Sequence, residues 1–252
     1  MTIWEIAVGI GAGLIAGCIN TLAGNGSALT LAVLMEFFGL PANIANGTNR
    51  LGIVAQSWAT TFSFIKEGRF DFHRNYQVLL WPVLGAFIGI YLAIIISSEG
   101  FRLVYKYLLL LMLVVILIKP KRWIQTPSGE NKTPMWIIYF IYFLIGIYGG
   151  FIQMGMGIFA LATFVLVGKM DIIKANVLKS YIVAVYTTIA LLVFAWQGLV
   201  HWGFGITLAI GQMAGGWTTA VFASRSPRAG IVAYYLLIIC VIGAILKVFG
   251  WV

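Results

Sequence analysis

Long apolar runs are the feature that most restricts what this sequence can fold into. They cover residues 79–96, 103–118, 136–147, 182–196 and 231–249. A helix needs about 20 residues to cross a hydrocarbon layer of about 30 Å. Charged residues make up 9% of the 252 residues, compared with about 25% in soluble domains. The sequence therefore predicts an all-α polytopic membrane protein with room for about eight to ten transmembrane or re-entrant helices.

Basic residues in the loops predict how these helices are oriented. The polar segment 119–134 carries four Lys or Arg residues, and Lys66, Arg69 and Arg74 form a second basic cluster. Because basic loops stay on the cytoplasmic side, we expect a first membrane repeat at 1–118, a cytoplasmic linker at 119–134 and a second repeat at 135–252. Both termini are then periplasmic, in a multi-pass protein of the bacterial inner (plasma) membrane. The net charge of +9 is explained by this topology, so no nucleic-acid partner is expected.

Ten apolar helices are expected from this pattern. They are 5–22, 27–38, 44–65, 75–97, 101–118, 135–152, 157–168, 175–196, 203–222 and 229–250. Segment 27–38 would form a helix of only about 18 Å, which is short for a crossing. We therefore favour re-entrant hairpins at 27–38 and 157–168, with full crossing left open.

The two halves match each other at fixed offsets. An offset of 133 places Gly13, Gly17, Asn20, Gly24 and Thr30 on Gly146, Gly150, Gln153, Gly157 and Thr163. An offset of 130 places Ala45 and Asn46 on Ala175 and Asn176. Since the basic loops give matching helices opposite orientations, the halves are predicted to be inverted repeats, a recurring design of secondary transporters.

Two polar interruptions, at 20–27 and 153–157, are predicted to be helix breaks near the middle of the membrane. Breaks free backbone N–H and C=O groups, which lipid cannot satisfy, so such segments line polar cavities. Gly9–Gly17, by contrast, is read as a stripe of small residues for helix packing.

Two further polar segments, 43–50 and 173–180, begin long helices and carry Arg50 and Lys179. Helix N-termini, cations and amide or hydroxyl donors together suit a small oxyanion. The alternative is that both cations only mark the membrane edges. The candidate substrate-binding residues are Asn20, Thr21, Asn25, Gly26, Ser27, Asn46, Thr48, Asn49, Arg50, Gln153, Met154, Gly155, Asn176, Lys179 and Ser180.

The segments 21–26 and 45–50, preceded by a Gly-x-x-x-Gly pattern, resemble the TauE/SafE-type sulfite exporter family. The resemblance extends over about residues 5–250 and includes the basic central loop. It implies a bacterial transporter for sulfur-containing anions such as sulfite, thiosulfate, sulfoacetate and other organosulfonates. The second half departs from the pattern, because Val177, Leu178 and Lys179 stand where Gly-Thr-Asn stands in the first half.

The expected mechanism is alternating access around one central anion site. A passive anion channel and a carrier of other small organic anions are the alternatives. An intramembrane enzyme is disfavoured because the two histidines, His73 and His201, lie in loops on opposite sides of the membrane. No cofactor or metal is expected, and the partners are a small anion and membrane lipid. A coupled proton or ion, with Glu36 as one candidate, and an oligomeric state are left open.

Overall fold

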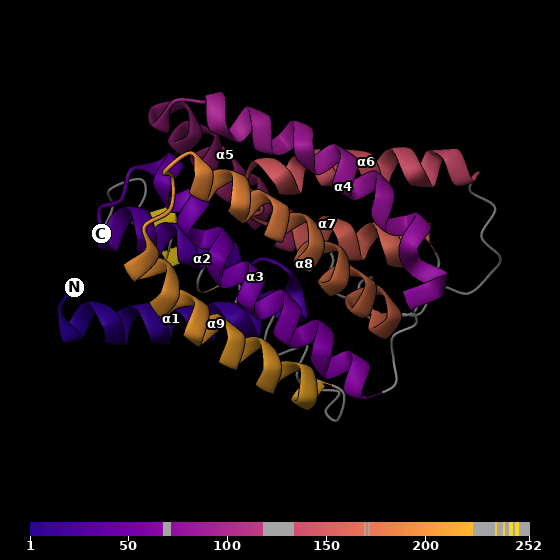
Figure 1. Ribbon diagram of the computed structural model, residues 1–252, viewed down its shortest axis with the longest axis horizontal. Coiled ribbons are helices and arrows are strands. Elements are labelled where there is room, and N and C mark those ends of the chain that lie inside the picture. Colours follow the sequence, from indigo (N-terminus) through magenta and orange to yellow (C-terminus); the bar gives the residue numbers. More distant parts are fainter. Residues whose placement is uncertain are drawn as a thin grey trace.

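The computed structural model describes residues 1–67, 72–117, 134–168, 170, 172–223 and six single positions between 235 and 246. The described part is helical (Figure 1). Its first half contains α1 (Ile3–Ala23), α2 (Gly26–Ala32), η1 (Val33–Phe37), α3 (Ala42–Lys66), α4 (Phe72–Ile95) and α5 (Ser98–Leu117). Its second half contains α6 (Met135–Phe151), α7 (Met156–Ala162), η3 (Thr163–Val167), α8 (Ile172–Trp196) and α9 (Trp202–Ala223). The all-helical prediction is confirmed.

The same order of elements occurs in both halves. In each, an apolar helix ends at a break, a seven-residue helix follows, and a five-residue π-helix leads to a helix of 25 residues. The short helices predicted at 27–38 and 157–168 are therefore present. Their π-helical ends were not predicted. Residues 119–133 of the expected linker, and all but single positions of the expected helix 229–250, lie outside the described residues.

The two 25-residue helices, α3 and α8, lie against each other and run antiparallel. Near the start of α3, Thr48 accepts a hydrogen bond of 2.9 Å from the backbone N–H of His201, just beyond the end of α8. Midway, Trp58 donates to Thr188 at 3.1 Å. At the other end, Phe64 packs in one cluster with Val177. The pair forms the middle of the molecule, with α4 and α6 on one side and α1 and α9 on the other (Figure 1).

Glycines bring each outer pair of helices into backbone contact. A Cβ added to Gly13 or Gly17 would overlap the backbone of α9, and one added to Gly146 or Gly150 would overlap the backbone of α4. Small residues allow this close approach, which is how membrane helices associate without a hydrophobic driving force between them. The packing role predicted for the Gly9–Gly17 stripe is confirmed for Gly9, Gly13 and Gly17, whereas Gly11 has open space around it.

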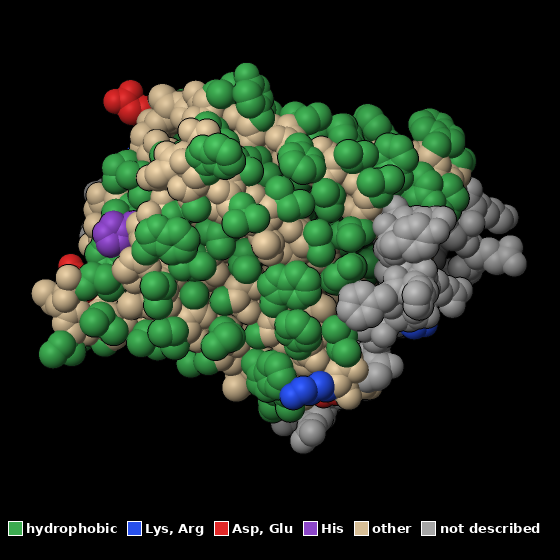
Figure 2. All heavy atoms as spheres, in the orientation of Figure 1, with side chains coloured by type: hydrophobic (Ala, Val, Ile, Leu, Met, Phe, Trp, Pro, Cys, Tyr) green, Lys and Arg blue, Asp and Glu red, His purple; other side chains and the backbone are tan. Residues whose placement is uncertain are grey.

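Polarity is arranged with apolar side chains outside and polar side chains inside. Trp4, Tyr107 and Trp196 are 69%, 65% and 90% exposed, and hydrophobic side chains spread over the face seen in Figure 2. Two described helical segments, Ile3–Leu22 and Lys174–Trp196, are long and apolar enough to cross a membrane, and several apolar helices are shorter. The interior, by contrast, contains Arg50 and Lys179 together with many Asn, Gln, Ser and Thr side chains. This arrangement is consistent with a polytopic membrane protein, because lipid contacts apolar surface.

Candidate functional site

The two helix breaks meet at the centre of the molecule. The backbone N–H of Gly157 donates to the carbonyl of Gly24 at 3.1 Å. Gly24 has a φ of 75°, a conformation that glycine adopts without strain. A Cβ on either glycine would overlap the backbone of the other. Contact between the breaks therefore requires glycine on both sides.

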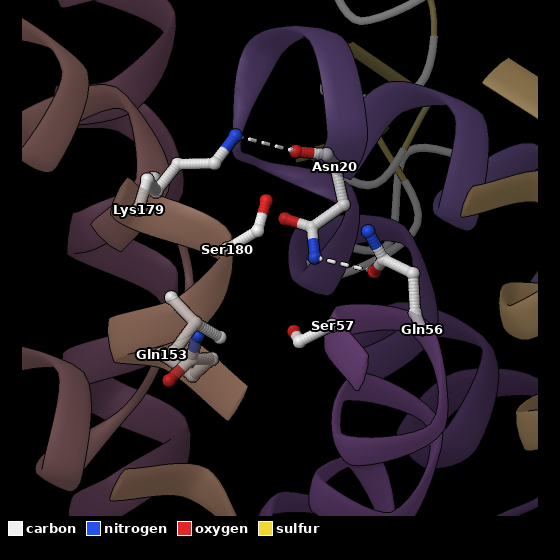
Figure 3. Close-up of a pocket in the computed structure, with 8 residues that line it drawn as sticks. Asn20, Gln56, Ser57, Gln153, Lys179 and Ser180 are labelled. Atoms are coloured by element: carbon white, nitrogen blue, oxygen red, sulfur yellow. Dashed lines mark hydrogen bonds between the residues drawn. The ribbon is translucent and has the colours of Figure 1, made fainter. Parts of the chain in front are cut away.

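A small polar cavity of about 10 Å³ lies beside this contact. Its walls come from α1, α3, α8 and the break before α7 (Figure 3). The lining residues are Asn20, Gln56, Ser57, Gln153, Gly157, Lys179, Ser180 and Val183. This space is close to the minimum that holds one water molecule, so it is too small for a sulfite ion.

Lys179 contributes the positive charge of this cavity. Its side chain is buried, and its Nζ donates to the backbone carbonyls of Asn20 and Thr21 at 3.2 Å each and to Asn176 Oδ1 at 2.8 Å. An ammonium has three donors, and all three are used. Asn20 and Thr21 are in the last turn of α1, whose carbonyls carry partial negative charge. Lys179, from the second half, therefore caps a helix of the first half.

Arg50 makes the reciprocal contact. Its guanidinium is buried and donates to the carbonyls of Gly149, Gly150 and Phe151 at 2.7, 2.8 and 3.2 Å. These carbonyls end α6, so Arg50 of the first half caps a helix of the second half. Asn46 has the role that Asn176 has beside Lys179. Its Oδ1 accepts a hydrogen bond from Arg50 Nη2 at 3.3 Å. Arg50 lies nine residues into α3, so its environment is the α6 C-terminus and not the free N–H groups at the start of α3.

These two cations are the buried charged side chains of the described part of the chain. Glu36, a candidate for proton coupling, lies elsewhere and accepts hydrogen bonds of 2.7 and 2.9 Å from Arg102 Nη2. Uncharged oxygens and two helix C-termini therefore surround the buried positive charge. A buried charge is costly unless a charge of opposite sign offsets it, so the electrostatics of this centre suit a small anion.

Gln153 lies between the cavity and Arg50. Its φ of 64° is the one positive value found for a described residue other than glycine. Its Oε1 accepts from Arg50 Nη1 at 3.1 Å and from the hydroxyl of Tyr186. On the facing wall, Asn20 donates to Gln56 at 2.7 Å, and Gln56 Nε2 donates to Thr21 at 3.0 Å. The polar wall is thus ordered by side chains from both halves.

Four predicted site residues line the cavity: Asn20, Gln153, Lys179 and Ser180. Four more predicted residues contact the cavity wall or the C-terminal ends of α1 and α6: Thr21, Asn46, Asn176 and Arg50.

The other predicted residues lie away from the cavity. Thr48 connects α3 to the segment before α9, and the carbonyl of Met154 accepts from Tyr148 at 2.5 Å. Gly155 is the N-cap of α7, with a φ of 70°, and Gly26 packs on the backbone of Ala16. Asn25 and Ser27 are buried with side chains that make no hydrogen bond within the described structure, and Asn49 accepts from Thr30 at 2.6 Å.

Gln56, Ser57 and Val183 line the cavity but were not among the predicted site residues. A signal was present in α3. Asn49, Gln56 and Thr60 are spaced by seven and four residues, which places them on one helix face. A polar stripe of this kind predicts a helix face turned to the polar interior, although Gln56 is the one residue of the three that lines the cavity.

Comparison with known proteins adds an independent observation. The model of the family described as "Sulfite exporter TauE/SafE" matches residues 9–246. A "Probable membrane transporter protein ORF9" of Sinorhizobium sp. is 26% identical over 81% of this chain and 77% of its own length. A "Probable membrane transporter protein" of Xylella fastidiosa is 26% identical over 89% and 87%. The "Probable membrane transporter protein YfcA" of Escherichia coli K12 is 25% identical over 80% and 74%. No solved structure matches the chain significantly.

Proposed function

Because the chain belongs to the sulfite exporter TauE/SafE family, whose curated relatives are named as membrane transporters, we propose that it is a secondary transporter of small sulfur-containing anions. The substrates would be sulfite, thiosulfate, sulfoacetate or other organosulfonates. They would cross the bacterial inner membrane by alternating access around the cavity between the two helix breaks. No enzymatic activity is expected of a transporter of this kind.

The observation that carries this proposal is the buried positive charge. Arg50 and Lys179 both lie in the interior, and the described part of the chain buries no carboxylate beside them. A transported anion in the cavity would supply the missing negative charge. A cation carrier would instead favour buried carboxylates, so the sign of the charge supports an anion.

The small size of the cavity supports a carrier more than a passive channel. A sulfite ion is larger than the single water molecule that about 10 Å³ can hold. The anion therefore enters only when the helices around the cavity separate. A channel would need a continuous polar path, whereas the described polar centre is small and compact.

Inverted repeats are part of this proposal. The repeated order of elements, the antiparallel α3 and α8, and the reciprocal caps by Arg50 and Lys179 all support a two-fold relation between the halves. Alternating access then requires one half to rock against the other around the fixed site. The multi-pass topology with both termini in the periplasm is likewise proposed from the basic loops.

A ligand screen tests the substrate class. Purified protein would be heated with sulfite, thiosulfate, sulfate, taurine, isethionate or simple carboxylates, and its melting temperature recorded. Stabilisation by sulfur oxyanions or sulfonates is expected, whereas selective stabilisation by carboxylates would indicate a carrier of other organic anions. In proteoliposomes, uptake that saturates with anion concentration is expected, and non-saturating electrogenic flux would indicate a channel.

A further inference from the structure

Arg50 does not line the cavity, although it is one of the two buried cations. Gln153 separates it from the cavity. The Gln153 carboxamide has a single acceptor oxygen, and this oxygen accepts from Arg50 Nη1 at 3.1 Å and from the hydroxyl of Tyr186. The contact of Arg50 with the cavity wall is therefore made through Gln153.

The orientation of the Gln153 amide follows from the chemistry of its neighbour. A guanidinium donates hydrogen bonds and cannot accept them, so the amide oxygen has to face Arg50. The nitrogen, Nε2, then projects the other way. In Figure 3 the oxygen of Gln153 is turned away from Asn20 and Ser57 on the facing wall of the cavity. The cavity is thus offered an N–H donor that forms no hydrogen bond elsewhere in the described structure.

The contacts of Arg50 also hold the backbone of Gln153. A φ of 64° is uncommon for residues other than glycine, so surrounding contacts have to maintain it. Arg50 supplies them by bonding the carbonyls of Gly149, Gly150 and Phe151, the last turn before the break. One guanidinium therefore fixes both the end of α6 and the side chain that follows it.

We propose that Gln153 Nε2 donates directly to the transported anion, and that Arg50 and Tyr186 are positioning residues that aim this donor. The proposal rests on the function proposed above and assigns distinct roles to the two cations. Lys179 places a positive charge in the cavity wall, whereas Arg50 lies behind Gln153 and orients its amide. A directional N–H suits an oxygen of a sulfite or sulfonate group.

A double-mutant cycle tests this arrangement. The dissociation constant for sulfite would be measured by calorimetry in oxygen-free buffer for the wild type, Tyr186→Phe, Gln153→Met and the double variant. Tyr186→Phe is expected to weaken binding about 2- to 10-fold when Gln153 is present, and to have no effect in the Gln153→Met background. Equal weakening in both backgrounds, or none in either, overturns the proposal.

Gln153→Glu provides a second test that is independent of folding. Glutamate keeps an acceptor for Arg50 and Tyr186, so this variant is expected to melt no lower than the wild type. It replaces the N–H donor by an oxygen, and sulfite binding is expected to fall at least tenfold, as in the neutral Gln153→Met variant. Wild-type affinity in Gln153→Met overturns the inference alone. Failure of the wild-type protein to bind sulfite or isethionate overturns the proposed function, and the inference with it.

Discussion

Lys179 and Asn20 belong to different halves of the chain, and the ammonium of Lys179 donates a hydrogen bond of 3.2 Å to the backbone carbonyl of Asn20 (Figure 3). Both residues also line the central cavity. The same cation therefore holds the end of α1 and presents charge to the site. An arriving anion would compete with the α1 carbonyls for this ammonium, which connects anion binding to the contact between the halves.

The first prediction concerns Lys179. Replacing it by methionine removes the charge of the cavity and keeps much of the side-chain volume. We expect the dissociation constant for sulfite to rise roughly 10- to 150-fold, because a hydrogen bond to a charged group contributes about 1.5–3 kcal/mol. Calorimetry would measure this. Lys66→Met, which removes an exposed Lys that stacks on Trp217, is the matched control and should bind normally. Unchanged affinity in Lys179→Met would contradict the anion site.

Arg50 should behave differently, because its main partners are backbone carbonyls. Arg50→Met removes five hydrogen bonds. At about 0.6 kcal/mol each, the average measured inside a membrane protein, their loss amounts to about 3 kcal/mol. We expect a clear drop in melting temperature without any ligand. Arg50→Lys should recover part of it, since an ammonium can still reach carbonyls but cannot bond them as a fork. Wild-type melting of Arg50→Met would refute the capping role.

Alanine substitutions at four glycines separate the cost of strain from the cost of a clash. Gly11 has open space around it, Gly39 has a φ of 66° and open space, Gly157 faces backbone, and Gly24 has both a positive φ and a backbone neighbour. Gly11→Ala should be neutral or stabilising by up to about 1 kcal/mol, and Gly39→Ala should cost about 1–2 kcal/mol.

Gly157→Ala should cost about 1–3 kcal/mol or more from overpacking, and Gly24→Ala should cost the most. Thermal unfolding of the four purified variants checks this order. A Gly157→Ala variant as stable as Gly11→Ala would show that the two breaks do not touch.

Asn25 distinguishes a structural role from a role in transport. Its side chain is 1% exposed, and neither of its polar atoms has a hydrogen-bond partner within the described structure. Asn25→Ala therefore breaks no hydrogen bond, and its free energy of unfolding should change by less than about 1 kcal/mol. If Asn25 is used when the site opens, uptake of sulfite into proteoliposomes should fall nonetheless. Normal uptake would remove Asn25 from the substrate-binding residues.

Glu36 and Arg102 form an ion pair at 2.7 Å, with Arg102 about half exposed at 48%. Pairs of this kind contribute at most about 1 kcal/mol, so Glu36→Gln should fold normally. Its effect on proton flux during sulfite uptake tests the coupling hypothesis. Loss of proton movement with retained sulfite uptake would assign coupling to Glu36. Unaltered proton movement would contradict the coupling role of Glu36.

The helices and their breaks could be predicted from the sequence, because lipid restricts the backbone to a few conformations. A backbone in hydrocarbon has to satisfy its own N–H and C=O groups, so long apolar runs form helices. Polar, glycine-containing segments such as 20–27 mark where the helices stop. The offset that relates Asn46 to Asn176 identified two residues that each accept from the buried cation of their own helix. Asn20 and Gln153, related by the other offset, both line the cavity. Local patterns were sufficient for these features.

Only the tertiary structure decided what the two cations do. The carbonyl partners of Arg50 lie about 100 positions away in the chain, and those of Lys179 about 160. No local pattern specifies which helix end will lie within reach of a side chain. The sequence determined that two cations would be present among helix breaks. Packing decided that both cap helices of the opposite half and that only Lys179 opens onto the cavity, since hydrogen bonds of this kind depend on three-dimensional proximity.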